Sequence, residues 1–161
     1  MSTRKRFLLL AAALSIGAVA VPAAAQPVRG HARTCAATFD HAQRTDMESF
    51  RDFKWETWLA GHDQDAVSII ADGRTQVGIE AIRASSAARF NAKNSVWSWT
   101  ELRRRVNGCH SGYITYNTKY ALPHLDYWFT AVTTVSYEYK AGRWLTVLDQ
   151  NTLLEEHVGN A

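Results

Sequence analysis

The strongest constraint on the fold is a run of alternating side chains from Leu125 to Lys140. One set of alternate positions is rich in aromatic and apolar residues: Tyr127, Phe129, Ala131, Thr133, Val135, Tyr137 and Tyr139. A period of two is typical of a β-strand, because successive side chains point to opposite faces of a sheet. Three more segments have this period: Val96–Val106, Tyr113–Leu122 and Arg143–Leu154. Turn-forming residues separate the four segments, so we predict four consecutive strands.

The chain before Ser95 has helical spacing instead. Three helices are predicted there: about Thr38 or Asp46 to Ala60, Gln64–Ile70 and Ile79–Phe90. Gly61 is a plausible end for the first helix, and Asp63 can cap the short second one. Helices followed by consecutive strands are typical of an α+β domain, in which the helices pack on one face of an antiparallel sheet.

Three local strings occur in order on these elements: Trp58–Val67 (WLAGHDQDAV), Gly78–Arg83 (GIEAIR) and Ala141–Val147 (AGRWLTV). They resemble segments of the nuclear transport factor 2-like (NTF2-like) superfamily, particularly its SnoaL-like branch. The resemblance covers about Thr45–Leu154 and implies a cone-shaped, strongly curved sheet of the cystatin-like type, wrapped around the N-terminal helices, with a pocket inside. The superfamily includes isomerases, dehydratases, epoxide hydrolases, cyclases, transport factors and non-catalytic association domains, so the resemblance does not decide the function.

Two features depart from that family. The stretch Ala71–Val77 is short, whereas family members often carry two short strands in this region. Members also often end the last strand with His-x-Ser or His-x-His, and the matching positions here are Gln150 and Thr152. Both differences argue against transferring a catalytic assignment from the family.

The N-terminus has the three parts of a secretory signal peptide. Arg4–Arg6 precede the apolar run Phe7–Val21, and Ala23–Ala25 provide a small-residue cleavage site. We predict a signal peptide over residues 1–25, a flexible leader over 26–37 and one domain over 38–157; an uncleaved anchor helix is the alternative. The location expected from this is periplasmic or secreted, with no membrane association after cleavage.

The net charge of +3 describes only the uncleaved chain. It comes from 18 basic and 15 acidic residues, and three of the basic residues lie in the predicted signal peptide. The mature domain is therefore formally neutral. Neutrality argues against nucleic acid as a partner, since a basic surface is what binds the phosphate backbone.

Cys35 and Cys109 fit an exported protein. An even number of cysteines in an oxidising compartment predicts a disulfide, and two free thiols are the alternative. The six histidines form neither a His-x-His nor a HExxH pair. His62 lies beside Asp63 and Asp65, but a helix cap explains these acids, so no metal and no cofactor are expected.

An aromatic, hydroxyl-rich lining is predicted for the inside of the sheet. If the tyrosine-rich face of Leu125–Lys140 points inward, it carries no acid, and comparison with the family places a similar set on the preceding strand: Ile114, Tyr116, Thr118 and Tyr120. The candidate ligand-binding residues are Trp55, Trp58, Trp99, Tyr120 and Tyr137. Tyrosines in such positions are also common as plain core. The leading hypothesis is a pocket for a small, mostly apolar molecule.

Two other functions remain open. A SnoaL-like isomerase, dehydratase or hydrolase would pair a carboxylate with a hydroxyl donor, as steroid isomerases do; the candidate catalytic residues are Glu101, Asp126, Tyr116 and Tyr127. Against this, Glu101 shares a predicted face with Arg103 and can simply form an ion pair at a solvated strand end. The third hypothesis is a non-catalytic dimerisation or partner-binding module, and a homodimer through the sheet is expected because the family often dimerises in this way.

Overall fold

A computed structural model describes residues 29–159 of the chain; the predicted signal peptide over residues 1–25 lies outside this range. The helices are α1 (Arg29–Arg51), α2 (Trp55–Ala60) and α3 (Ile79–Ala92), with a 3-10 turn at Pro123–Leu125. The strands are β1 (His62–Ile69), β2 (Thr75–Val77), β3 (Val96–Asn107), β4 (Ser111–Leu122), β5 (Tyr127–Lys140) and β6 (Arg143–Val158). The four predicted strands and the third helix are confirmed.

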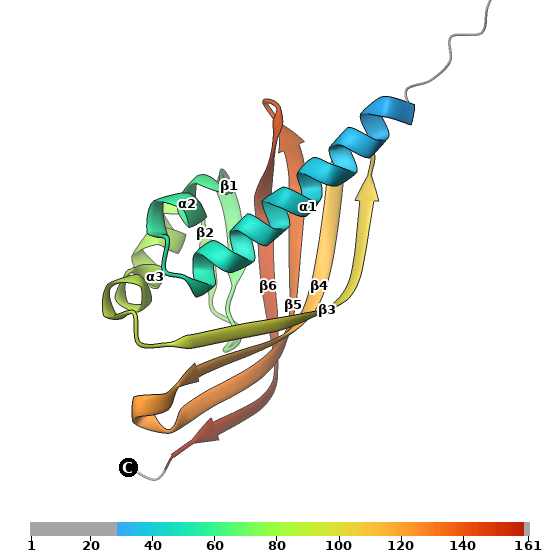
Figure 1. Cartoon of the computed structure of the whole chain (residues 1–161). Helices are drawn as coiled ribbons and strands as arrows, with labels where there is room; N and C mark the ends of the chain where they lie inside the picture. The colour runs from blue at the N-terminus through green and yellow to red at the C-terminus, as the bar shows by residue number, and fades with distance from the viewer. Residues whose placement is uncertain (1–28, 160–161) are drawn as a thin grey trace, which may run out of the picture.

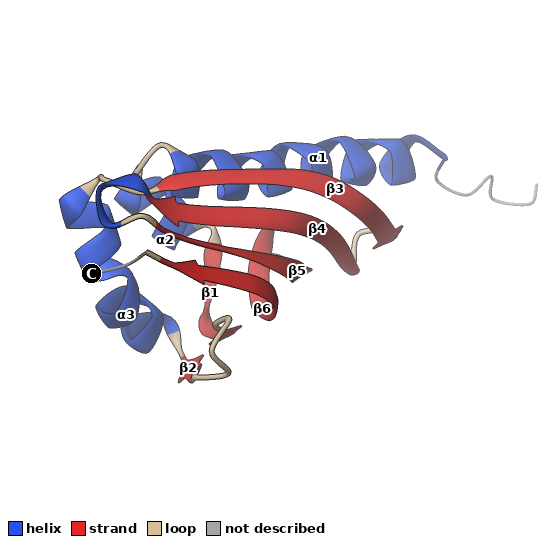
Figure 2. Ribbon diagram, turned by 90° about the horizontal axis from the view of Figure 1, so that it is seen from below, coloured by secondary structure: helices blue, strands red, loops and turns tan. Residues whose placement is uncertain are grey.

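The strands form one sheet in the order β2-β1-β6-β5-β4-β3, which curves around α1 (Figures 1 and 2). The two ends of the sheet, β2 and β3, do not pair with each other, so the sheet is open. Neighbouring strands are antiparallel except β1, which runs parallel to β6. The α+β fold with helices inside a curved sheet is confirmed, but the sheet is mixed rather than purely antiparallel.

The predicted second helix over Gln64–Ile70 is wrong, because the residues from Gln64 to Ile69 lie in β1. Val67 pairs with Val77 on one side and with Leu148 on the other. A short apolar run does not distinguish a helix from a strand, and the deciding bonds come from a strand about 80 positions later. β1 and β2 are two short strands in the region where the short stretch Ala71–Val77 predicted a departure from the family. This predicted departure is therefore wrong.

The first helix is also divided differently from the prediction. Its helical path stops at Arg51, Phe53 adopts a positive φ of 57°, and α2 then follows. Residues 29–37 belong to α1 rather than to a flexible leader, and residues 26–28 of the predicted leader lie outside the described range. Cys35 explains part of this order: it is buried, and the indole of Trp144 donates a hydrogen bond to its carbonyl at 3.3 Å.

The predicted disulfide is confirmed and ties α1 to the turn between β3 and β4. Cys35 and Cys109 are joined across 74 positions, with their Cα atoms 5.4 Å apart. Beside it lies the main core, which includes Phe39, Ile114, Tyr116, Tyr137 and Trp144. Gly112 is required there, since a Cβ at this position would lie 2.7 Å from a ring carbon of Phe39. Among the described residues, no helix is long and apolar enough to cross a membrane.

A β-bulge in β3 changes which arginine meets Glu101. The pairing with β4 shifts by one residue between Glu101 and Arg103, so the alternation of faces is interrupted at that point. Arg104 therefore replaces Arg103 on the face of Glu101 and forms a two-pronged ion pair with it, and Arg104 also binds Asp40 of α1. The predicted partner of Glu101 is corrected from Arg103 to Arg104.

Candidate functional site

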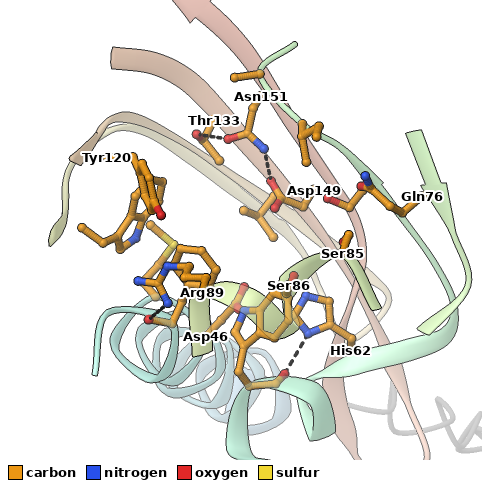
Figure 3. A pocket seen from close by; sticks show the side chains of 18 of the residues that line it. Asp46, His62, Gln76, Ser85, Ser86, Arg89, Tyr120, Thr133, Asp149 and Asn151 are labelled. Atoms are coloured by element: carbon orange, nitrogen blue, oxygen red, sulfur yellow. Dashed lines mark hydrogen bonds between the residues drawn. The ribbon is translucent and has the colours of Figure 1, made fainter. Parts of the chain in front are cut away.

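A cavity of about 430 Å³ lies between the concave face of the sheet and the helices (Figure 3). Phe50, Trp58, Trp97 and Phe129 form the aromatic part of its wall. This volume lies within the range of small-molecule sites, which are mainly apolar with a few oriented polar groups. The tyrosine-rich face of β5 points inward, which the alternation alone did not decide, because Thr133, Val135 and Tyr137 are all buried.

Asp149, on β6, gives this cavity an acid whose protonation state changes near neutral pH. Burial, and secondarily the negative charge of Asp46, raises its pKa from the ordinary 3.8 to about 7. The amide of Asn151 donates a hydrogen bond of 3.1 Å to Oδ1 of Asp149, which acts in the opposite direction. Asp149 is therefore a mixture of carboxylic acid and carboxylate at neutral pH.

A chain of hydrogen bonds fixes the orientation of Asn151. Its Nδ2 also donates to the carbonyl of Ile69 at 3.2 Å, and its Oδ1 accepts from the hydroxyl of Thr133 at 2.6 Å. Thr133 in turn lies 2.8 Å from the hydroxyl of Thr118 on β4. Three strands therefore hold the amide that contacts Asp149, so this carboxyl group is pre-oriented toward the cavity.

Asp46, on α1, is the second acid in the cavity wall and is only 8% exposed. Its Oδ2 accepts hydrogen bonds from the hydroxyls of Tyr137, at 2.9 Å, and Thr146, at 3.2 Å. Burial and the charge of Asp46 raise the pKa of Tyr137 well above its usual 10. Tyr137 therefore stays protonated and serves as a permanent donor to Asp46.

His62 lies at the start of β1 and is buried. Its Nδ1 is 2.8 Å from the carbonyl oxygen of Trp58, which can only accept, so Nδ1 carries the hydrogen. In the neutral ring, Nε2 then has the lone pair and is the acceptor. The His62 side chain lies in the same wall as Asp46 (Figure 3). The site thus combines the carboxyl group of Asp149, which can donate or accept a proton, with the Nε2 acceptor of His62.

The four predicted catalytic residues are described, and the cavity wall does not include them. Glu101 is held by Arg104, and Asp126 lies 3.3 Å from His157 at an exposed position. The hydroxyl of Tyr127 donates to Glu156, whereas that of buried Tyr116 donates to Gln43 at 2.7 Å. Glu101 and Tyr116 lie opposite each other on β3 and β4, but among the described residues no hydrogen bond joins a predicted acid to a predicted hydroxyl.

Of the predicted ligand-binding residues, Trp58 and Tyr120 line the cavity. Tyr137 lies behind the wall and reaches the site through Asp46. Trp55 packs instead against Phe90 of α3, with ring centroids 4.5 Å apart, and Trp99 lies beneath the guanidinium of Arg51. The described part of the chain contains no group of three or more His, Cys, Asp or Glu side chains that could hold a metal ion.

The expectation that the lining has no acid is wrong, because Asp46 and Asp149 both lie in the wall. Two sequence signals could have revealed them. Asp46 falls at the spacing of the buried residues Phe39 and Gln43 on α1, which marks the inner face of that helix. On β6, Asp149 and Asn151 are two apart and pair with the inward residues of β5, whereas the comparison with the family considered Gln150 and Thr152.

Neither protein-family models nor curated protein sequences give a match to the chain. Solved structures do, at low sequence identity. An NTF2-like protein of unknown function from Pseudomonas putida KT2440 is 15% identical, with a TM-score of 0.65 over 76% of this chain and 89% of that one. A ketosteroid isomerase-like protein from Erwinia carotovora atroseptica is 11% identical, with a TM-score of 0.63 over 74% and 95%.

A third similar structure is a hexachlorocyclohexane dehydrochlorinase, LinA type 2, which is 14% identical. Its TM-score is 0.63, over 80% of this chain and 91% of that one. At these identities the likeness concerns the fold and leaves the chemistry to the site itself. The chain therefore has the NTF2-like fold that its three local strings predicted.

Proposed function

We propose that the cavity binds one small, mostly apolar molecule. The observation that carries this proposal is a concave space of about 430 Å³ with an aromatic wall, at the centre of the curved sheet. Native cores are close-packed, and a space of this size is much larger than ordinary packing defects. Burying an apolar ligand there is favourable by roughly 25 cal/mol for each Å² removed from water.

A neutral fluorescent probe, N-phenyl-1-naphthylamine, tests this directly. We expect its emission to rise on binding to the wild-type protein and to saturate at one equivalent. Ser86→Phe, on the cavity side of α3, should weaken probe binding by filling the space. Ala88→Phe is the matched control, since Ala88 is exposed on the same helix. Equal binding to both variants, or no binding to the wild type, would contradict the proposal.

A second candidate is a proton-transfer enzyme, and the position of Asp149 favours it. A carboxyl group whose pKa is about 7 can donate and accept a proton at neutral pH, which is what general acid–base catalysis requires. His62 supplies a second basic atom in the same cavity. Once a substrate is found, Asp149→Asn should abolish turnover while leaving ligand affinity within about twofold. Retained turnover would remove this candidate.

We also propose that the protein is exported and forms a homodimer. The disulfide is compatible with an oxidising compartment. Exposed apolar side chains, Val96 and Leu154 among them, are available on the strands for contact with a second copy. N-terminal sequencing of the protein from a bacterial periplasm should give Gln26 as the first residue; an intact Met1 in the purified protein would argue against cleavage.

A further inference from the structure

Arg89, on α3, brings an unneutralised positive charge to the cavity wall. Its Nη1 donates to the carbonyl of Phe50 at 2.7 Å, in the last turn of α1, where a cation is favourable. Its Nε and Nη2 are buried and have no hydrogen-bond partner. Within residues 29–159, its guanidinium forms no salt bridge with a carboxylate. Capping α1 thus uses one of the five N–H donors of Arg89, and no carboxylate of the described residues neutralises its charge.

Aromatic rings surround this charge without neutralising it. The guanidinium carbon lies 3.7 Å from the ring centre of Phe50 and 4.5 Å from that of Phe53, with Tyr120 at 6.0 Å. Cation–π contacts offset only part of the cost of removing an ion from water. Burial accordingly lowers the pKa of Arg89 to about 10, which still leaves it protonated at neutral pH.

The N–H groups of Arg89 that lack partners are the two that an oxyanion prefers. Nε and Nη2 share one edge of the planar guanidinium, and their parallel hydrogens match the two oxygens of a carboxylate. The indole Nε1 of Trp97 is another buried donor without a partner, and its ring packs on the same Phe50 ring at 5.3 Å. Tyr120 lies beside Arg89 at this end of the cavity (Figure 3). We call Arg89, Trp97 and Tyr120 the donor end.

We propose that the donor end binds the carboxylate of a monoanionic ligand whose remaining body is apolar and lies on the aromatic wall. This inference rests on the proposed function, namely that the cavity binds a small molecule. Because Nε and Nη2 of Arg89 are covered in the structure, binding requires a rotation of the Arg89 side chain, which is only partly buried. Asp46 on α1 and Asp149 on β6 also line the cavity and would repel a second negative charge, so the ligand carries one.

Matched acids and amides separate this inference from the proposed function. The probes are phenylacetate, 2-naphthylacetate and 4-biphenylacetate, each paired with its neutral primary amide, and affinity is measured by calorimetry on the intact, disulfide-bonded chain at pH 7.5. We expect the acids that fit to bind at least about tenfold more tightly than their amides, as a charge-assisted pair would give. Arg89→Met should remove this preference, so that each acid binds no more tightly than its amide; a preference retained in a folded Arg89→Met variant would overturn the inference.

Arg83→Met is the control, because Arg83 lies on the same helix and pairs with Glu80 at the surface. This variant should keep the preference for acids. Acids that bind no better than amides would overturn the inference and leave the proposed function standing, whereas failure of both series would overturn both. If Arg89→Met does not fold, as judged by loss of its circular dichroism signal, the neutral variant Arg89→Gln takes its place. Loss of the preference for acids in folded Arg89→Gln supports the inference, and its retention refutes it.

Discussion

Replacing Asp149 with Asn removes a group that makes the folded state sensitive to pH. The folded protein keeps the Asp149 proton up to about pH 7, whereas the unfolded chain releases it near 3.8. Between these values the folded state binds more protons than the unfolded state, so the free energy of unfolding falls as the pH rises through this window. Asn resembles the protonated acid in shape and charge, so Asp149→Asn should abolish this loss.

The pKa difference sets the size of the effect. From 3.8 to about 7, at 1.36 kcal/mol per pKa unit, the ionised state costs the fold at most about 4 kcal/mol. About 1.5 kcal/mol of this loss is present at pH 5 and nearly all of it at pH 8. We therefore expect the stability of Asp149→Asn relative to wild type to rise by about 2–3 kcal/mol between pH 5 and pH 8.

Urea unfolding followed by tryptophan fluorescence at pH 5, 6, 7 and 8 measures this difference. Comparing the two proteins at each pH cancels the groups that titrate in both. Asp65→Asn, at an exposed position on β1, controls for the loss of one negative charge. Parallel stability curves for wild type and Asp149→Asn across this range would refute the reasoning, because they would mean that Asp149 titrates alike in the folded and unfolded states.

Three further predictions follow from the fold. Replacing both Cys35 and Cys109 with Ser should lower the free energy of unfolding by about 4 kcal/mol, given the 74-residue separation; an unchanged urea midpoint would contradict this. Gly112→Ala should destabilise by about 1–3 kcal/mol, because its Cβ would meet the Phe39 ring, and a melting temperature equal to wild type would show that the ring moves freely. Light scattering at micromolar concentration should report a dimer, and a monomer mass would count against the proposed homodimer.

The cysteine pair and the strong alternation of β3 to β6 were readable from the sequence. A period of two over 12 or more residues has few structural solutions, and the chain order of helices and strands then limits the fold class. The disulfide followed from the number of cysteines and the predicted compartment rather than from geometry. These features depend on local pattern, so no tertiary information was needed for them.

The helix predicted over Gln64–Ile70 failed for a different reason. β1 is a strand because β6, which lies far along the chain, offers its edge for parallel pairing. The bulge after Glu101 likewise changed the ion-pair partner of this residue from Arg103 to Arg104. A bulge adds one residue to a strand, and counting alternate positions along the sequence does not reveal it. In both cases the missing information was the register between distant strands.

The site was decided by the tertiary structure. Asp46, His62, Arg89 and Asp149 come from α1, β1, α3 and β6, and no sequence motif links the four positions. Folding encloses them in one cavity, where burial raises the pKa of Asp149 to about 7 and leaves two N–H groups of Arg89 without partners. The sequence determined the elements through local periodicity, but the protonation and hydrogen-bonding state of each group depends on desolvation and neighbours that only the packed fold supplies.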